Sequence, residues 1–362
     1  MPRDSLFGDR VLWTGQPRLS RCPLGYRLVA GAFALVSLIT LAFATVVSMS
    51  LHVAVGTMLV FAGWCATLAL LAWRLPIVFR AGLQYTVTDR HVIWKRGKLR
   101  RSIERSSVSF ARIVWNPRVP GVGDLVLVRA VPTGALRRTL TLTLSDVEAP
   151  DRLWAKIRGA QPSEAMGDGD RPVSQRLQEG ERVLWSAIPL AAPWSTRRIG
   201  ATVLSLLIAG AGLRTLLRVI PPVHRVHHSL TPFTFAILVV GVVLSLLLVT
   251  SAAVVVGYAA VVRPMRLRKE TRYFVTNERV LIRRGQEELS LDRARIAYVI
   301  TAPSGGRRLS DLFLVLDGPK ARAMAMSGAF GSDASVDLEP VFTAIDDAET
   351  PHAILFELKS AA

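Results

Sequence analysis

The chain has 362 residues, an apolar content of 51% and a formal charge of +18 at neutral pH. Its length allows two or three domains, and its mean hydropathy of +0.36 is high for a water-soluble protein. The cysteines, Cys22 and Cys65, are too few for a disulfide framework or a cysteine metal set.

Four apolar blocks without a charged residue follow one another in two pairs, over 28–47, 51–73, 199–213 and 229–262. A helix needs about 20 apolar residues to cross a bilayer. The first, second and fourth blocks are long enough, and the third is long enough if Arg214 extends its side chain to the interface. We therefore predict four transmembrane helices in two hairpins, the first turning at 48–50 and the second through a loop at 221–231. A signal peptide is the alternative for the first block, but a second apolar block follows at once.

The basic residues gather beside these blocks. Residues 74–118 contain eleven Lys or Arg and only two acidic residues, and further arginines flank the second apolar pair. Positive flanks mark the cytoplasmic side of membrane helices, so we expect the N-terminus, the central segment and the C-terminus in the cytoplasm. Topology and contact with anionic lipid account for this charge, and we expect no nucleic-acid partner.

An internal repeat organises the chain. The motif Gly-Asp-Arg-Val-Leu-Trp at 8–13 returns as Gly-Glu-Arg-Val-Leu-Trp at 180–185, a shift of 172 positions. After the apolar pairs the shift is 188, and 83–97 matches 271–285. We also match Trp154 and Ile157 with Phe342 and Ile345 at this shift. One unit was duplicated: a short amphipathic lead-in, a transmembrane hairpin and a cytoplasmic domain.

The repeat predicts the domain boundaries. The first copy has a lead-in at 1–27, a hairpin at 28–75 and a domain at 76–160. Residues 161–179 are rich in small, polar and helix-breaking residues, which is typical of a flexible linker. The second copy has a lead-in at 180–198, a hairpin at 199–262, a domain at 263–350 and a tail at 351–362.

Each cytoplasmic domain is predicted to contain short antiparallel strands and one terminal helix. Asp89 and Asn277 suit the corners of strand hairpins. The helix of the first domain begins at Pro150 and buries Leu153, Trp154 and Ile157. Further strands are expected at 108–114, 125–130, 140–144, 296–301, 312–316 and 322–326, and the second terminal helix at Asp337 with Val341, Phe342 and Ile345 buried. The pattern indicates an α+β membrane protein whose domains are small barrels or sandwiches capped by a helix.

In both copies, Gly-Asp/Glu-Arg-Val-Leu-Trp precedes two membrane helices, followed by Tyr-x-Val-Thr-Asp/Asn, a basic strand ending in Gly, and a terminal helix. This order resembles the bacterial pleckstrin-homology-like (PH-like) membrane proteins over nearly the whole chain. The resemblance implies two PH-like domains, each a seven-stranded partial barrel capped by a helix, at the bacterial cytoplasmic membrane. It also implies a binding platform, and for some members a link to envelope stress or antimicrobial-peptide resistance. An accessory part of an export or resistance system is a further alternative for this chain.

Two sets of residues are candidate binding sites. The cationic hairpin of Lys95, Arg96, Lys98, Arg100 and Arg101 is suited to anionic lipid headgroups, although general attraction to the membrane surface explains it as well. The second copy carries Glu287 and Glu288 at the same place, so the two domains do not share this task. The pairs Arg10 with Trp13, and Arg182 with Trp185, are expected to anchor at the interface or, less favoured, to dock a partner.

No phosphate-binding loop, nucleophile elbow or zinc spacing occurs. His224, His227 and His228 form a local cluster, but Pro221 and Pro222 favour an irregular loop over a metal site. We therefore expect a non-enzymatic scaffold without cofactor or metal, which lies in the lipid bilayer and binds a membrane-proximal protein. An anionic-lipid-sensing module is the alternative.

Overall fold

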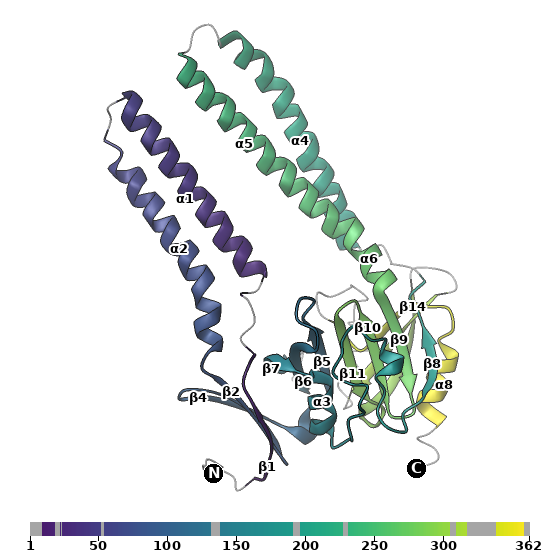
Figure 1. The fold of residues 1–362 in the computed structure, drawn as a ribbon. Helices are drawn as coiled ribbons and strands as arrows, with labels where there is room; N and C mark the ends of the chain where they lie inside the picture. Colours follow the sequence, from purple (N-terminus) through teal and green to yellow (C-terminus); the bar gives the residue numbers. More distant parts are fainter. Residues whose placement is uncertain are drawn as a thin grey trace. The chain divides into compact units, whose positions relative to one another are not determined.

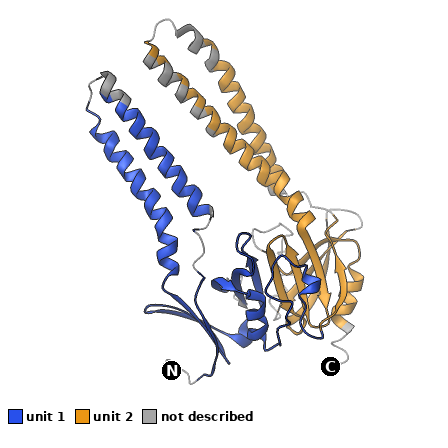
Figure 2. Cartoon of the chain, in the orientation of Figure 1, with its two compact units in different colours: residues 1–131, 138–180 blue, residues 132–137, 181–362 orange. Residues whose placement is uncertain are grey.

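The computed structural model describes residues 9–18, 22, 24–51, 54–131, 138–190, 196–226, 231–304, 309–316 and 338–357. The fold is α+β, and the chain divides into two compact units (Figure 2). Unit 1 comprises residues 1–131 and 138–180, and unit 2 comprises residues 132–137 and 181–362.

Each unit contains a pair of long helices that lie side by side (Figure 1). They are α1 (Leu24–Leu51) with α2 (Gly56–Arg80), and α4 (Thr196–Val226) with α5 (Pro232–Gly257). Within unit 1, Ser37 Oγ donates a hydrogen bond of 2.8 Å to the carbonyl of Ala62. Within unit 2, Ser205 Oγ donates a bond of the same length to the carbonyl of Ala253. Small residues at these contacts allow the helix backbones to approach closely.

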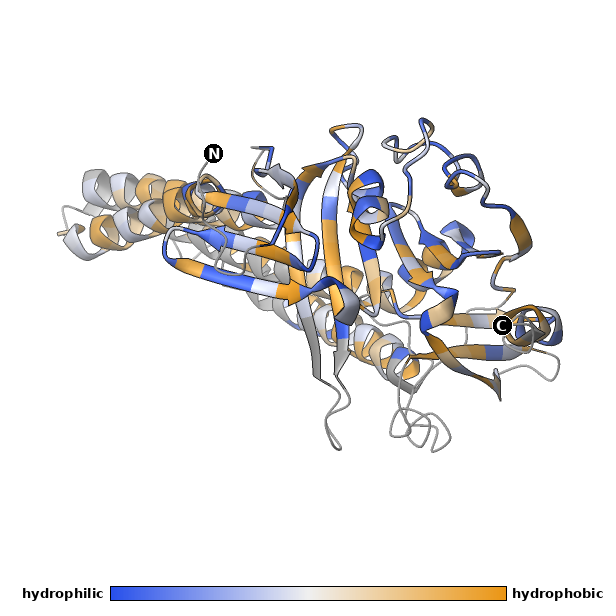
Figure 3. Ribbon diagram, turned by 90° about the horizontal axis from the view of Figure 1, so that it is seen from below, coloured by the Kyte–Doolittle hydropathy of each residue, from blue (hydrophilic) through white to orange (hydrophobic). Residues whose placement is uncertain are grey.

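Three of the described helices are long and apolar enough to cross a membrane, over Gly25–Thr45, Gly56–Arg80 and Arg198–Arg218. Many of their exposed side chains are large and apolar, such as Leu38, Trp64 and Leu206. The ribbon coloured by hydropathy shows apolar residues along the long helices (Figure 3). The helix α5 has 26 residues, and none of them is charged.

The helix ends differ from the prediction. The first turn was expected at 48–50, but α1 continues to Leu51, because this stretch contains no Gly or Pro. The second loop was expected to begin at Pro221, but α4 includes both prolines and ends at Val226. A proline inside a helix removes the hydrogen bond to the carbonyl four residues earlier and its ring crowds that carbonyl, yet α4 continues for one more turn after Pro222.

The described part of unit 1 contains seven strands, followed by one short helix. The strands β1 (Val11–Gly15), β2 (Leu83–Thr88), β3 (His91–Arg96) and β4 (Leu99–Glu104) pair antiparallel in this order. A 3₁₀ turn, η1 (Arg105–Ser107), leads to β5 (Phe110–Trp115), β6 (Val122–Val131) and β7 (Arg138–Glu148), which pair in chain order. The helix α3 (Pro150–Arg158) follows, with proline in its first turn as predicted.

Unit 2 repeats this order of elements. The strands β8 (Val183–Ala187), β9 (Thr271–Thr276), β10 (Arg279–Arg284) and β11 (Glu287–Asp292) pair as β1 to β4 do. After η4 (Arg293–Arg295), the strands β12 (Ile296–Pro303), β13 (Ser310–Leu316) and β14 (Val341–Ile345) pair in chain order, and α8 (Glu349–Glu357) follows. Between α5 and β9 the chain forms a π-helical turn, η3 (Tyr258–Val262), and α6 (Arg263–Glu270).

The strands β1–β4, the strands β5–β7 and the helix α3 of unit 1 share one hydrophobic core. Tyr85 and Val87 of β2 pack in it with residues of β5 to β7, and Leu153, Trp154 and Ile157 of α3 close one side. Alternate residues of a strand point to opposite faces, which is why every second residue of β2 is in this core. The described strands are not closed into a barrel, which excludes a closed barrel from the two forms, barrel or sandwich, that were expected for each domain.

Three further predictions of secondary structure are wrong. Residues 341–345 form β14 rather than part of a terminal helix, because a short apolar run fits either period. The helix lies at Glu349–Glu357, across the predicted boundary of the tail at 351. Phe342 therefore does not correspond to Trp154 of α3. The expected strand at 322–326 lies outside the described residues.

The two lead-ins and the linker also have a different structure from the one expected. The amphipathic lead-ins contain the edge strands β1 and β8. The segment 161–179 contains a short 3₁₀ turn, η2 (Val173–Gln175), and buries Met166, Val173 and Arg176. It is therefore a packed part of the protein rather than a flexible linker.

Candidate functional site

In each unit a carboxylate, a threonine and a basic side chain connect the chain just before the first strand to the corner of a strand hairpin. The corner is β2–β3 in unit 1 and β9–β10 in unit 2. We call this set of three residues the strand clamp. In unit 2, Glu181 accepts hydrogen bonds from Arg279 Nε at 2.8 Å and Arg279 Nη2 at 2.9 Å, and from Thr276 Oγ1 at 2.7 Å. The two charged side chains are 0% and 6% exposed. These hydrogen bonds compensate the two charged groups for the water that they lose on burial.

Unit 1 uses a weaker base at the equivalent place. His91 Nδ1 lies 2.8 Å from Asp9 Oδ2, and Thr88 Oγ1 lies 3.2 Å from the same oxygen. The hydrogen bond to His91 lowers the pKa of Asp9. The clamp of unit 1 therefore pairs its carboxylate with an imidazole, whereas the clamp of unit 2 pairs its carboxylate with a guanidinium.

A second repeated contact joins the strand corner to the terminal helix. Arg105 donates to the carbonyls of Asp89 and Ile157, at 2.8 and 2.7 Å. Arg293 donates to the carbonyls of Thr276 and Ile354. A guanidinium has five N–H donors in a planar fork, so one side chain binds both elements.

A third repeated set lies where β7 and β14 bend. Asp146 and Ala344 have positive φ angles of 52° and 50°. Their backbone N–H groups donate to Asp124 Oδ1 and Asp311 Oδ1, each at 2.7 Å. Burial raises the pKa of Asp124 and raises that of Tyr85, whose hydroxyl accepts from Ser145 N, to about 12. In unit 1 alone, the Asp146 carboxylate pairs with Arg80 at 2.5 Å, which ties the end of α2 to β7.

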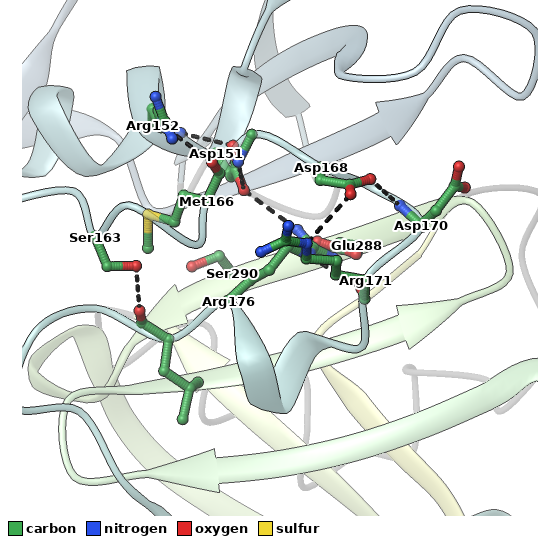
Figure 4. Close-up of polar contacts among 12 residues, drawn as sticks. Asp151, Arg152, Ser163, Met166, Asp168, Asp170, Arg171, Arg176, Glu288 and Ser290 are labelled. Atoms are coloured by element: carbon green, nitrogen blue, oxygen red, sulfur yellow. Dashed lines mark hydrogen bonds and ion pairs between the residues drawn. The ribbon is translucent and has the colours of Figure 1, made fainter.

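The segment 159–180, which we call the strap, packs on α3 and β5 of unit 1 (Figure 4). Asp151 of α3 accepts from Gly167 N at 3.0 Å and pairs with Arg176 Nη1 at 3.3 Å. The Arg176 guanidinium also lies 5.1 Å from the centre of the Trp115 ring. A Cβ on Gly169 would be 2.4 Å from this indole, so the strap requires glycine here.

The cationic hairpin lies beside the end of α2. The strand β2 begins three residues after Arg80, and its first residue, Leu83, pairs with Arg96. The Arg96 guanidinium lies 4.0 Å from the centre of the Phe79 ring in the last turn of α2. The strand pairing therefore brings the predicted set together at the helix end, with Lys95 directly opposite Arg100 and Arg101 opposite Trp94.

The corresponding hairpin of unit 2 contains ion pairs. Arg284 Nη2 lies 2.7 Å from Glu287 Oε2, and Arg283 Nε lies 3.8 Å from Glu288 Oε1. Glu270, at the end of α6, lies close to the turn of this hairpin: a Cβ on Gly285 would be 2.8 Å from Glu270 Oε2. The basic residues near this turn therefore have carboxylates beside them.

The structure places Arg10 at a strand corner and Trp13 against the core of unit 1. Arg10 precedes β1, and its carbonyl accepts from Asp89 N at the β2–β3 corner, the far end of β2 from α2. A strand of six residues makes this separation roughly 17 Å. Trp13 packs against the unit 1 core.

The equivalent residues of unit 2 are placed in the same way. The carbonyl of Arg182 accepts from Asn277 N at the β9–β10 corner. Trp185 stacks on Phe342, with ring centres 5.6 Å apart. These arginines mark strand corners, and the tryptophans cover the domain cores.

His224 lies in the last turn of α4, whereas His227 and His228 are outside the described residues. Within the described part of the chain, no group of three or more His, Cys, Asp or Glu residues is placed to hold a metal ion.

Comparisons with protein-family models, with curated proteins and with solved structures found no match.

The sequence indicated the cationic hairpin but missed the strand clamps. Their acidic members, Asp9 and Glu181, were visible in the repeated motif, and the basic members His91 and Arg279 occupy matching positions in the repeated hairpins. Opposite charges at two matched pairs of positions were the available signal. The Arg80–Asp146 pair carried no such signal, because Ala344 replaces the aspartate in the second copy.

Proposed function

We propose that this chain is a non-enzymatic, multi-pass membrane protein that presents two PH-like domains to the cytoplasm as a scaffold for protein partners. The apolar faces of α1, α2 and α4 support membrane insertion, and α5 supplies a fourth uncharged helix. Both ends of each helix pair lead into the β-strands of the same unit, which agrees with both domains lying on one side of the membrane.

The orientation follows from the charges beside the helices. Arg74 and Arg80 are at the domain end of α2, and six Lys or Arg flank the domain ends of the second pair: Arg197, Arg198, Arg263, Arg266, Arg268 and Lys269. Basic flanks favour the cytoplasmic side. We therefore propose the bacterial cytoplasmic membrane, with both termini in the cytoplasm.

The observation that carries the scaffold proposal is an apolar strand edge that occurs in both units. Among the described strands, β1 and β8 each stand at the end of the strand order of their sheet, with β2 and β9 as their single neighbours. Val11 and Leu12 are 51% and 45% exposed, and the equivalent Val183 and Leu184 are 36% and 37% exposed. An edge strand with exposed apolar side chains is suited to adding a strand from a partner. Two such edges on one chain raise the effective concentration of a partner that binds both.

A photo-crosslinking amino acid at Leu12 and at Leu184 tests the scaffold proposal in the native membrane. We expect discrete crosslinked products that contain one protein partner, and we expect the control position Ser102, which is exposed on β4, to give none. Purification in mild detergent, followed by mass spectrometry, would identify that partner. Equal crosslinking at all three positions, or none at either edge, would contradict the proposal.

A further inference from the structure

The tip of the β3–β4 hairpin in unit 1 stands apart from its counterpart in unit 2. We define the tip as residues 95–101, with 283–289 as the equivalent tip of unit 2. The position of the tip relative to the membrane rests on the proposed membrane placement of α2. Arg96 of the tip contacts Phe79 in the last turn of that helix. Residue 96 therefore lies at the depth where the predicted span of α2 ends.

The tip combines cationic residues with one exposed apolar side chain. Lys95, Lys98 and Arg101 are exposed, and Leu99 is 65% exposed. Gly97 has a φ angle of 55°, which favours glycine and makes the turn tight. Gly97 and Lys98 form the turn, and Leu99 follows as the first residue of β4, paired with Arg96. A leucine among cations enters the headgroup region of a bilayer readily, because the apolar part leaves water while the charges meet lipid phosphates.

Unit 2 provides an internal comparison at the same positions. The unit 1 tip has five cationic and no acidic residues, and Gly82 lies in the turn between α2 and β2. The unit 2 tip has two cationic residues and two acidic ones, and Glu270 stands in place of Gly82. Glu287 and Glu288 replace Leu99 and Arg100 and pair with the remaining arginines. The strand register at the turn is the same in the two units, so the tips differ in the chemistry of their side chains.

We infer that the unit 1 tip is a bilayer-contact site that binds the phosphate groups of anionic lipids and inserts Leu99 between them, and that the unit 2 tip is not. This assigns different tasks to two domains with the same fold: unit 1 rests on anionic lipid, and unit 2 is held by its helices alone. Lipid composition then affects the position of unit 1 without affecting unit 2.

The test uses the full chain in nanodiscs, with Cys22 and Cys65 replaced by Ala and an environment-sensitive fluorophore at Leu99→Cys. Glu287→Cys is the matched control at the equivalent position of unit 2. We expect the emission of the probe at 99 to shift to the blue in phosphatidylglycerol discs relative to phosphatidylcholine discs, and the probe at 287 to stay unchanged. Salt at about 1 M reduces the Debye length to about 3 Å and should reverse the shift at 99.

Two exchanges of residues between the tips complete the test. Lys98→Gln with Arg100→Glu gives unit 1 the residues of unit 2 and should abolish the shift at 99. Gln286→Lys with Glu288→Arg should create a shift at 287. Equal emission at 99 in both lipids, or a shift that survives the first exchange, would overturn the inference.

Inorganic phosphate distinguishes a bilayer site from a site for the free anion. Phosphate added to phosphatidylcholine discs should leave the probe at 99 unchanged, and a response there would overturn the bilayer assignment. Insertion of the chain into discs is measured separately by their co-purification, so failure of the membrane proposal is distinguishable from failure of the lipid site.

Discussion

At the scale of single residues, the two units attach their first strand with different basic side chains. Both attach the first strand to a corner through a carboxylate and a threonine hydroxyl, but the base is His91 in unit 1 and Arg279 in unit 2. The unit 2 pair is almost fully buried, whereas the His91 side chain is 24% exposed. The energetic importance of the two clamps should therefore differ.

Replacement of the two bases measures this difference. Arg279→Ala leaves Glu181 buried without its partner, and loss of one member of a buried ion pair costs about 3–5 kcal/mol of folding free energy. We expect His91→Ala to cost less, because water reaches this pair. Thermal unfolding of the full chain in detergent, with each variant beside the wild type, provides the comparison. Equal losses for the two variants would contradict the expected difference.

The buried carboxyl of Asp124 predicts a pH dependence. Its pKa is raised by burial above the ordinary value of 3.8. A carboxyl with a higher pKa in the folded state binds its proton more tightly there, so stability falls as pH rises from the ordinary pKa through the folded pKa. Asp124→Asn retains an oxygen for the Asp146 N–H and carries no charge. We expect this variant to be more stable than the wild type above that pH window and equal to it below pH 3.8.

Unfolding of Asp124→Asn and of the wild type across this pH range checks the prediction. Asp311→Asn in unit 2 is the matched variant, because its carboxyl also accepts a backbone N–H at a positive φ angle. A stability difference for Asp124→Asn that does not change with pH would contradict the assignment of the raised pKa to this group.

At the scale of elements, the sequence predicted the repeated strand hairpins better than the places where strands give way to helices. The strands β2, β3, β9 and β10 follow from period-two patterns that occur twice in the chain. The strand β14 was missed because Val341, Phe342 and Ile345 fit a helical face as well as a strand, and neighbouring β13 decides between them.

The strap shows why composition was a poor guide to order. Its glycines and prolines are typical of a flexible linker, yet Gly169 lies against Trp115 because it has no side chain. Asp151, on the helix α3 that precedes the strap, supplies the hydrogen bond and ion pair that hold the segment. These contacts join residues that local sequence reasoning treats separately.

Gly169→Ala tests the packing of the strap. The added methyl group would overlap the Trp115 ring, and overpacking of this kind costs about 1–3 kcal/mol. We expect limited proteolysis to cleave 159–180 faster in this variant than in the wild type. Gly82→Ala is the control, because the nearest atom to its added Cβ is at 4.0 Å. Unchanged cleavage in Gly169→Ala would show that the strap does not depend on this contact.

At the scale of the whole molecule, the duplication accounts for both the likeness and the difference of the units. The repeated motifs predicted two copies of one unit, and the elements do recur in the same order. The different charges of the hairpin tips were also visible in the sequence. Their position beside the helix end was not, because it depends on the pairing of Leu83 with Arg96 and on the contact of Arg96 with Phe79.

The central claim is that both units lie on the cytoplasmic side of one membrane, joined to it by helix pairs. Single cysteines at Ser102, Glu278 and Ala54, which are exposed in unit 1, unit 2 and the α1–α2 connection respectively, test it in a chain with Cys22 and Cys65 replaced. An impermeant maleimide is applied to right-side-out and inside-out vesicles. We predict labelling at 102 and 278 only in inside-out vesicles, and at 54 only in right-side-out vesicles. Labelling of 102 and 278 in opposite preparations, or of all three positions in the same one, would contradict this topology.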